Sequence, residues 1–253
     1  MQASVKKAPQ LILKGPCVTL TDSMIEGQIK LLQARISEAC ARVGRPAEEV
    51  QTVLVTKQVK PERIQEAYQA GIRDFGESRV QEWETKSTQL PGDIRWHLIG
   101  HLQTNKVKQV VGKTVLIHSC DRMDLAEAIQ KEAEKQAQTV SVLIQVNVSG
   151  EITKQGFFPE EMRTAVGKIS KLSRIQILGL MTIGPLTENQ DQIRKSFKSL
   201  RQLREKLKTE FKTIDWRYLS MGMSSDFEIA VEEGANLLRV GSLVFGARAV
   251  KSK

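Results

Sequence analysis

The sequence predicts a single (β/α)8 barrel. The main observation is an alternation of about eight short apolar runs with amphipathic, charged segments along the 253 residues. Several runs, such as residues 142–146, are almost continuously apolar, which is typical of parallel strands that are covered on both faces. No linker rich in Pro, Gly or Ser divides the chain, so we expect one barrel domain over residues 23–253.

The N-terminal part differs from this alternation. Residues 1–22 are expected to form a loosely attached extension, because their only hydrophobic stretch is too short for a signal peptide or a membrane span. Ser23 and Glu26 then form a capping-box pattern, and apolar residues recur at helical spacing from Ile25 to Cys40. The pattern predicts an N-terminal helix ahead of the barrel.

The remaining elements follow in order. Strands are predicted near residues 51–56, 72–76, 95–99, 114–118, 141–148, 175–181, 216–220 and 237–240. Helices are predicted near residues 61–70, 78–89, 102–111, 122–138, 159–172, 188–211 and 225–233. An open doubly wound sheet is the alternative, but no GxGxxG motif follows the first strand.

Lys57 is the first candidate for chemistry. It follows the apolar run at residues 53–55, and in a barrel the C-terminal ends of the strands form the active face. Burial lowers the pKa of an amine, and a neutral amine is a nucleophile that can form a Schiff base. The alternative is that Lys57 ends the strand and points into water.

Two late segments have the composition of a phosphate-binding site. Residues 220–224 offer small side chains, hydroxyl groups and a helix start, and Gly241 with Ser242 offers unshielded backbone N–H groups. Barrels often hold phosphate with the loops that follow strands seven and eight. Each segment alone is also compatible with an ordinary turn.

Together these segments resemble the pyridoxal phosphate homeostasis protein family, whose members are single-domain barrels that bind pyridoxal 5'-phosphate (PLP) and are related to the N-terminal domain of alanine racemase. The resemblance extends from about residue 24 to residue 248. The matching motifs include Val55-Thr56-Lys57, Phe75-Gly76-Glu77, His97-Leu98-Ile99-Gly100-His101, Gly179-Leu180-Met181-Thr182, Ser220-Met221-Gly222-Met223-Ser224 and Arg239-Val240-Gly241-Ser242.

The resemblance implies roles for individual residues. Lys57 matches the lysine that forms the Schiff base, and Arg239 matches the arginine that faces the pyridine nitrogen. Phosphate binding is implied for Ser220, Met221, Gly241 and Ser242. Arginine keeps its proton, so it leaves the pyridine nitrogen unprotonated and the ring a weaker electron sink. Ser78 stands where the family usually has Asn, so a contact near the cofactor is expected to be lost or mediated by water.

Composition limits the other function classes. The net charge of +9 suits a nucleic-acid partner, but the basic residues alternate with Gln, Glu and Ser on amphipathic patterns, so we favour solvated helix faces and expect no nucleic acid. Three cysteines without metal spacing indicate reduced thiols and a cytoplasmic location, and no membrane partner is expected. His97 and His101 are four residues apart, but lie in a predicted strand and the loop after it, so no metal site is expected.

Two functions remain after the resemblance. One is a PLP carrier or buffer in PLP homeostasis with little or no turnover; the other is a PLP-dependent amino-acid racemase or lyase. Racemisation needs a base on each face of the cofactor, and neither Tyr68 in a helix pattern nor Tyr218 in strand seven is an obvious second base. The sequence also shows no second domain of the kind that supplies this base in alanine racemase-like enzymes. We therefore favour the carrier, with apo forms of PLP enzymes as recipients, in a monomer or weak homodimer.

Overall fold

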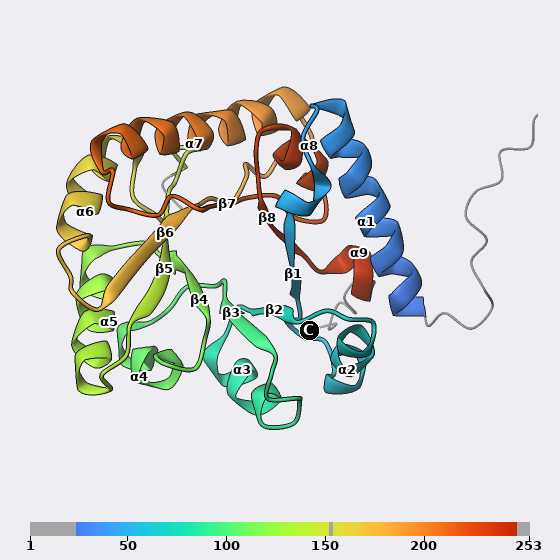
Figure 1. Ribbon diagram of the computed structural model, residues 1–253, viewed down its shortest axis with the longest axis horizontal. Coiled ribbons are helices and arrows are strands. Elements are labelled where there is room, and N and C mark those ends of the chain that lie inside the picture. The colour runs from blue at the N-terminus through green and yellow to red at the C-terminus, as the bar shows by residue number, and fades with distance from the viewer. Residues whose placement is uncertain (1–23, 152–153, 247–253) are drawn as a thin grey trace, which may run out of the picture.

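A computed structural model describes residues 24–151 and 154–246 of the chain. Its centre is a closed barrel of parallel strands that hydrogen-bond in sequence order from β1 to β8. Helices surround the barrel on the outside (Figure 1). The predicted (β/α)8 barrel with an N-terminal helix is confirmed.

The strands are short and follow the predicted apolar runs. They are β1 (Gln51–Val55), β2 (Asp74–Glu77), β3 (Arg95–Leu98), β4 (Leu116–Cys120), β5 (Val140–Gln145), β6 (Ile175–Met181), β7 (Tyr218–Ser220) and β8 (Leu237–Val240). The register between β1 and β8, from Gln51 opposite Leu237 to Leu54 opposite Val240, closes the barrel.

The helices cover every strand from outside. They are α1 (Met24–Arg42), α2 (Pro61–Gln69), α3 (Val80–Ser87), α4 (Val107–Val110), α5 (Met123–Lys135), α6 (Met162–Ile169), α7 (Gln190–Glu210), α8 (Phe227–Glu232) and α9 (Ser242–Phe245). Single turns of 3-10 helix are Ala47–Glu49, Thr104–Lys106 and Pro159–Glu161. The helix α1 packs against α2, α8 and α9, and so lies beside the point where the barrel closes (Figure 1).

Most differences from the sequence-based boundaries are small, and the largest is in α4. The strands β2, β4 and β7 begin two residues later than predicted, and β5 ends three residues earlier. The helix α4 begins at Val107 instead of near residue 102, and α9 was not predicted. The proposed extension over residues 1–22 and the capping residue Ser23 lie outside the described residues.

The barrel has two hydrophobic layers because alternate strand residues point inward and outward. Outward residues and the helices form the larger core, which includes Leu54, Phe75 and Leu98. A smaller cluster fills the barrel interior: Val53, Leu116, Leu143, Leu178, Met181 and Leu237. Other buried residues of the strands are polar, and they include His97, His118, Ser220 and Arg239. The interior therefore combines an apolar layer with a polar one.

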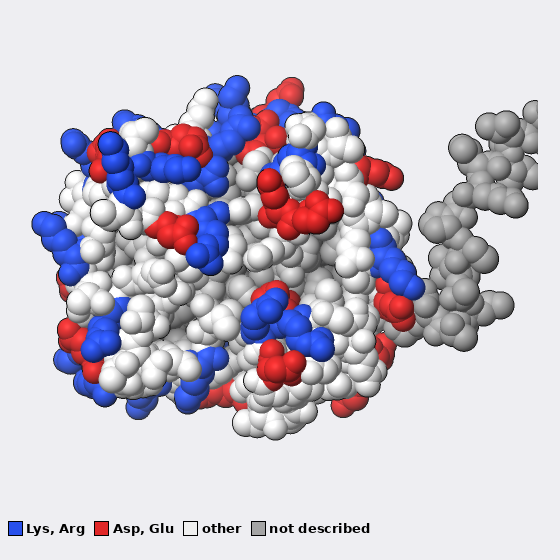
Figure 2. Space-filling view, in the orientation of Figure 1, with Lys and Arg blue, Asp and Glu red and all other residues white. Residues whose placement is uncertain are grey.

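Charged side chains lie mainly on the helices. Figure 2 shows Lys and Arg interspersed with Asp and Glu over one face of the molecule, without a single large basic patch on that face. Several basic residues of α1 and α7 pair with acidic ones, as Arg163 of α6 does with Glu210. Within the two described ranges, no helix has the length and apolar character needed to cross a membrane.

Candidate functional site

A cavity of about 370 Å³ opens at the C-terminal ends of the strands. Its lining comes from several strand ends and loops: Val55, Lys57, Ser78, Ile99, Gly100, Ile183, Met223, Ser224, Ser225, Arg239, Gly241 and Ser242. Five of the seven residues predicted to bind the cofactor are therefore brought together: Lys57, Ser78, Arg239, Gly241 and Ser242. The volume lies in the range usual for sites that hold small molecules.

Lys57 enters this cavity from the first turn after β1. The side chain of Lys57 is half-buried, and the next residue, Gln58, has a φ of 62°. This left-handed conformation is unusual for a residue with a side chain, so the surrounding structure has to hold it in place. Lys60, three positions further on, and Lys106, which follows β3, do not line the cavity.

A buried ionic cluster holds the residues on both sides of Lys57. Lys86 of α3 donates from Nζ to the carbonyl oxygen of Thr56 at 2.7 Å, to Glu77 Oε1 at 2.7 Å and to Glu82 Oε1 at 2.7 Å. The Thr56 hydroxyl donates to Glu77 Oε1 at 2.6 Å, and the Gln58 N–H donates to Glu82 Oε1. Both neighbours of Lys57 are thereby fixed to one buried ammonium and its carboxylates.

Burying the charges of this cluster has a large desolvation cost. The Glu77 side chain is fully buried and Lys86 is 5% exposed. Burial raises the pKa of Glu77, while hydrogen bonds from Lys86 and Thr56 oppose that rise. Glu77 Oε2 has no hydrogen-bond partner among the described residues. Buried ion pairs seldom stabilise a fold more than apolar residues would, so we interpret this cluster as a device that fixes the backbone on both sides of Lys57.

Arg239 is the second charged residue of the cavity lining. It points inward from β8 and is 5% exposed. Its guanidinium donates to Ser220 Oγ at 2.7 Å and to the Thr182 carbonyl oxygen at 2.9 Å. Burial lowers the pKa of Arg239 to about 10, against the opposing effect of the Asp226 carboxylate. Arg239 thus stays charged at neutral pH and is held by two neutral acceptors.

The loops after β7 and β8 meet beside the turn after β1 at the cavity. The Gly241 N–H donates to Ser224 Oγ at 3.3 Å, which ties the two loops together. A Cβ atom at position 241 would lie 2.9 Å from the carbonyl oxygen of Val55. Gly241 is therefore required for the close approach of its loop to β1, in addition to any role toward a ligand.

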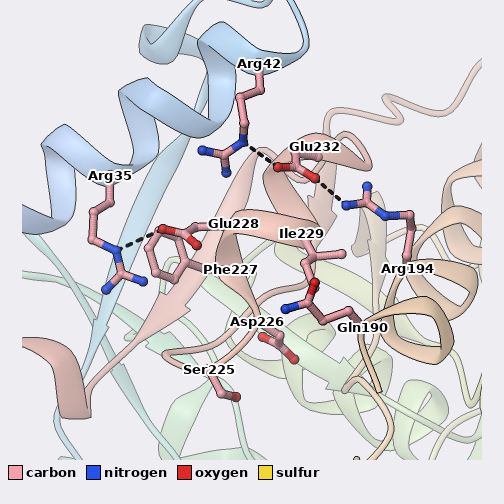
Figure 3. Close-up of a pocket in the computed structure, with 10 residues that line it drawn as sticks. All are labelled: Arg35, Arg42, Gln190, Arg194, Ser225, Asp226, Phe227, Glu228, Ile229 and Glu232. Carbon is pink, nitrogen blue, oxygen red and sulfur yellow. Dashed lines mark hydrogen bonds and ion pairs between the residues drawn. The ribbon is translucent and has the colours of Figure 1, made fainter. Parts of the chain in front are cut away.

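The segment at residues 224–226 leads into α8, which is held from both sides (Figure 3). Arg35 of α1 bonds Glu228 at 2.9 Å, and Arg42 bonds Glu232 at 2.7 Å. Arg194 of α7 bonds the other oxygen of Glu232. These side chains line a second hollow of about 300 Å³, which shares Ser225 with the first cavity. Since each guanidinium is paired with a carboxylate, we interpret this hollow as a support for the loop.

Ser220 and Met221 do not line the cavity. The Ser220 hydroxyl lies inside the barrel against His118 and Arg239, and Met221 is buried in the outer core. Sequence reasoning omitted Ser224 and Ser225 as individual site residues, as well as the apolar Ile99 and Ile183. Ser224 lies within residues 220–224, the segment whose composition predicted phosphate binding. Its hydroxyl was therefore the feature from which a role in the site could have been predicted.

Ser78 lies where the sequence places it, at the end of β2. Its backbone passes so close to Gly100 that a Cβ atom there would lie 2.3 Å from the Ser78 carbonyl oxygen. Ser78 lines the cavity, so its short hydroxyl side chain can contact a ligand there directly or through a water molecule.

The histidines are engaged in separate contacts. His101 lies 2.9 Å from the Asp121 carboxylate, whereas His97 contacts His118 and Asp74. In the described ranges, no group of three or more His, Cys, Asp or Glu residues is arranged to hold a metal ion. Cys40 and Cys120 are buried free thiols.

The two tyrosines lie away from the cavity lining. The Tyr68 hydroxyl donates to Asp93 at 2.7 Å on the outside of the barrel. Tyr218 packs against the apolar cluster of the barrel interior. Among the described residues that line the cavity, the ionisable side chains are those of Lys57 and Arg239.

Comparison with known proteins shows which families and structures this chain is similar to. The family described as alanine racemase, N-terminal domain, matches residues 29–249. The pyridoxal phosphate homeostasis protein of Aquifex aeolicus is 47% identical over 85% of this chain and 94% of its own length. That of Pseudomonas aeruginosa is 35% identical over 89% and 96% of the two chains.

Solved structures agree with these relatives. PipY of Synechococcus elongatus, solved with PLP bound, has a TM-score of 0.78 and 35% identity over 88% of this chain and 100% of its own. Alanine racemase of Clostridium difficile, at 14% identity and a TM-score of 0.67, covers 89% of this chain and 61% of its own, and shows the fold alone. The chain therefore belongs to the alanine racemase N-terminal domain family and, within it, to the pyridoxal phosphate homeostasis proteins.

Proposed function

We propose that this chain binds PLP through Lys57 and acts in PLP homeostasis as a carrier or buffer of the cofactor. The observation that carries this proposal is the convergence of an amine, a guanidinium and two hydroxyl-bearing loops on one cavity: Lys57, Arg239, Ser224 with Ser225, and Gly241 with Ser242. PLP combines an aldehyde, an aromatic ring nitrogen and a phosphate, and the cavity offers a suitable group for each.

The residues fit the cofactor in separate ways. When bound, PLP supplies an aldehyde carbon that the Lys57 amine can attack. We assign to Arg239 the hydrogen bond to the ring nitrogen, because it is the arginine of the cavity lining. For the phosphate we propose the serine hydroxyls and the backbone N–H groups of Gly241 and Ser242, with the Gly241 N–H exchanging its bond to Ser224 Oγ for one to the phosphate. Any share of Ser220 and Met221 in phosphate binding would rest on their backbone atoms.

Low turnover is the second part of the proposal. A racemase or lyase moves protons at the substrate, and racemisation needs a group on each face of the cofactor. Within the described ranges, the ionisable residues of the cavity lining are Lys57 and Arg239. An arginine that keeps its proton is a poor general base. Arg239 beside the ring nitrogen would also weaken the ring as an electron sink.

The setting of this function follows the sequence-based expectations. We propose cytoplasmic apo forms of PLP enzymes as recipients of the cofactor, and a monomer or weak homodimer as the active form. The direct test is transfer. The PLP-loaded protein is mixed with a PLP-dependent apoenzyme, and recovery of that enzyme's activity is followed against free PLP at the same concentration. Absence of PLP binding, or a loaded protein that never releases PLP, would contradict the proposal.

A further inference from the structure

A chain of hydrogen bonds crosses the barrel interior and ends at the cavity. Asp74 Oδ1, at the start of β2, lies 3.0 Å from His97 Nε2. His97 Nδ1 lies 3.0 Å from His118 Nε2, and His118 Nδ1 lies 2.9 Å from Ser220 Oγ. Ser220 Oγ in turn accepts from Arg239 Nη1 at 2.7 Å. Five side chains from β2, β3, β4, β7 and β8 thus form one continuous path.

The chemistry of the two ends decides where every proton lies. A guanidinium only donates, so the Ser220 oxygen accepts from Arg239. The hydroxyl has one hydrogen, Ser220 is fully buried, and its remaining neighbour among the described residues is His118 Nδ1. Leaving that hydrogen without an acceptor would cost about 1–3 kcal/mol, so the hydroxyl donates to His118 Nδ1.

This donor-to-acceptor direction then fixes the remaining hydrogen bonds as far as Asp74. Because His118 accepts at Nδ1, its own hydrogen is at Nε2 and points to His97 Nδ1. His97 therefore carries its hydrogen at Nε2 and donates it to Asp74. Asp74 is a suitable terminus, because an ionised carboxylate only accepts. Burial raises the pKa of Asp74, but hydrogen bonds from Arg95 and His97 outweigh this and lower it to about 2.

We propose that Ser220, His118 and His97 are positioning residues that hold Arg239 in the cofactor cavity by connecting it, in one direction only, to the Asp74 carboxylate. This inference rests on the proposed function, because it assigns Arg239 to the ring nitrogen of PLP. Among the described residues, no carboxylate forms an ion pair with Arg239. Its buried charge is balanced through the polarised chain to Asp74, and at longer range by Asp226.

The chain also fixes the orientation of the guanidinium. The bond to Ser220 and the bond to the Thr182 carbonyl engage Nη1 and Nη2 of the same planar group. A planar group held at two points cannot rotate, so its edge toward the cavity is presented at one angle. Loss of the Ser220 contact should therefore loosen Arg239 even though Ser220 itself does not line the cavity.

The tautomers provide a test that does not involve PLP. Nitrogen-15 NMR distinguishes the two neutral tautomers and the protonated form of histidine. The chain has three histidines, so a His101→Gln variant leaves only the two of interest. Both His97 and His118 should carry hydrogen on Nε2 and none on Nδ1. Hydrogen on Nδ1 of either ring, or a protonated ring, would overturn the proposed direction of the chain.

Binding measurements provide the second test. Ser220→Ala should release the His118 tautomer and weaken PLP binding by about tenfold, the usual effect of losing one hydrogen bond to a charged group. Arg95→Ala is the matched control, since it removes the exposed partner of Asp74 and leaves the chain of hydrogen bonds from Asp74 to Arg239 intact. It should keep PLP affinity within about twofold. Wild-type affinity in Ser220→Ala would overturn the positioning role.

The two tests separate the possible failures. If the wild-type protein does not bind PLP but shows both predicted tautomers, the chain stands as a support for Arg239 and the proposed function is wrong. If PLP binds and the tautomers differ from the prediction, the function stands and the positioning chain is wrong. The NMR measurement needs no substitution in the hydrogen-bonded path from Asp74 to Arg239. It therefore tests the direction of that path even where Ser220→Ala fails to fold.

Discussion

Lys86 Nζ lies 2.7 Å from the backbone carbonyl oxygen of Thr56, the residue immediately before Lys57. The ammonium group comes from α3, on the outside of the barrel, and Lys57 points to the inside. The connection between these two lysines is therefore made through the backbone. A buried charge on the outer side of the turn after β1 thus holds the backbone from which Lys57 enters the cavity.

Removing Lys86 should destabilise the fold strongly. Lys86→Met leaves the fully buried Glu77 carboxylate without its counter-charge, and we expect a loss of about 3–5 kcal/mol in the free energy of unfolding at neutral pH. The loss should shrink as the pH falls toward the raised pKa of Glu77, because the neutral acid needs no counter-charge. Chemical denaturation at several pH values measures this.

The control for Lys86→Met is the double variant Glu77→Gln with Lys86→Met, which removes both charges and should recover much of the stability. It should nevertheless link PLP to Lys57 more slowly than the wild type, since Thr56 and Gln58 are no longer held. Equal stability of wild type and Lys86→Met would show that the buried pair is unimportant.

The two loops of the proposed phosphate site predict different effects for glycine and serine. Gly241→Ala places a Cβ atom against the Val55 carbonyl, so it should lower both PLP affinity and the stability of the PLP-free protein. Ser224→Ala and Ser242→Ala should lower affinity by about tenfold or less and change stability little. Thermal unfolding with and without PLP separates the two effects. Unchanged affinity in both serine variants would place the phosphate elsewhere.

Asp74 predicts a specific pH dependence of stability. Its pKa in the folded protein is about 2, below the ordinary value of 3.8, so the ionised carboxylate stabilises the fold. This contribution, about 2 kcal/mol, is complete above pH of about 4 and is lost as the pH falls toward about 2. The stability difference between wild type and Asp74→Asn should therefore be largest near neutral pH and decrease below pH of about 4. A difference that grows on acidification would contradict it.

Low turnover predicts slow exchange at the α-carbon of amino acids. With alanine in deuterated solvent, the PLP-loaded protein should incorporate little deuterium, because the described part of the cavity lining offers no second base beside Lys57. Mass spectrometry of the recovered alanine detects proton removal even without net reaction. Rapid exchange that disappears in Lys57→Ala would support the racemase-like alternative instead.

Much of the fold was predictable from sequence because barrel strands are marked by apolar runs and barrel helices by amphipathic ones. The strand β8 and the helix α2 lie almost where the pattern puts them. The helix α9 has only four residues, too few to show a helical period. Lys57, Arg239 and Gly241 were predictable as site residues because strand ends in a barrel converge on one face.

The polar interior was not predictable in the same way. Ser220 is the last residue of β7, and whether its hydroxyl reaches the cavity or the barrel interior depends on the side chains of other strands, here His118 and Arg239. The cluster around Lys86 was missed for a related reason. A lysine inside a charged helix normally faces solvent, and only the packing of α3 against β1 and β2 reveals that Lys86 is buried.

The most direct test of the whole account is to identify the residue that binds PLP covalently. The protein is incubated with PLP, reduced with borohydride, digested and analysed by mass spectrometry, with Lys57→Ala treated in parallel. We predict a single major modified peptide that carries the label on Lys57, and no specific label in the variant. Equivalent labelling of another lysine with Lys57 unmodified would contradict the assignment of the site. One such lysine is Lys154, which donates to the carbonyl oxygen of Gly184, next to Ile183 of the cavity lining.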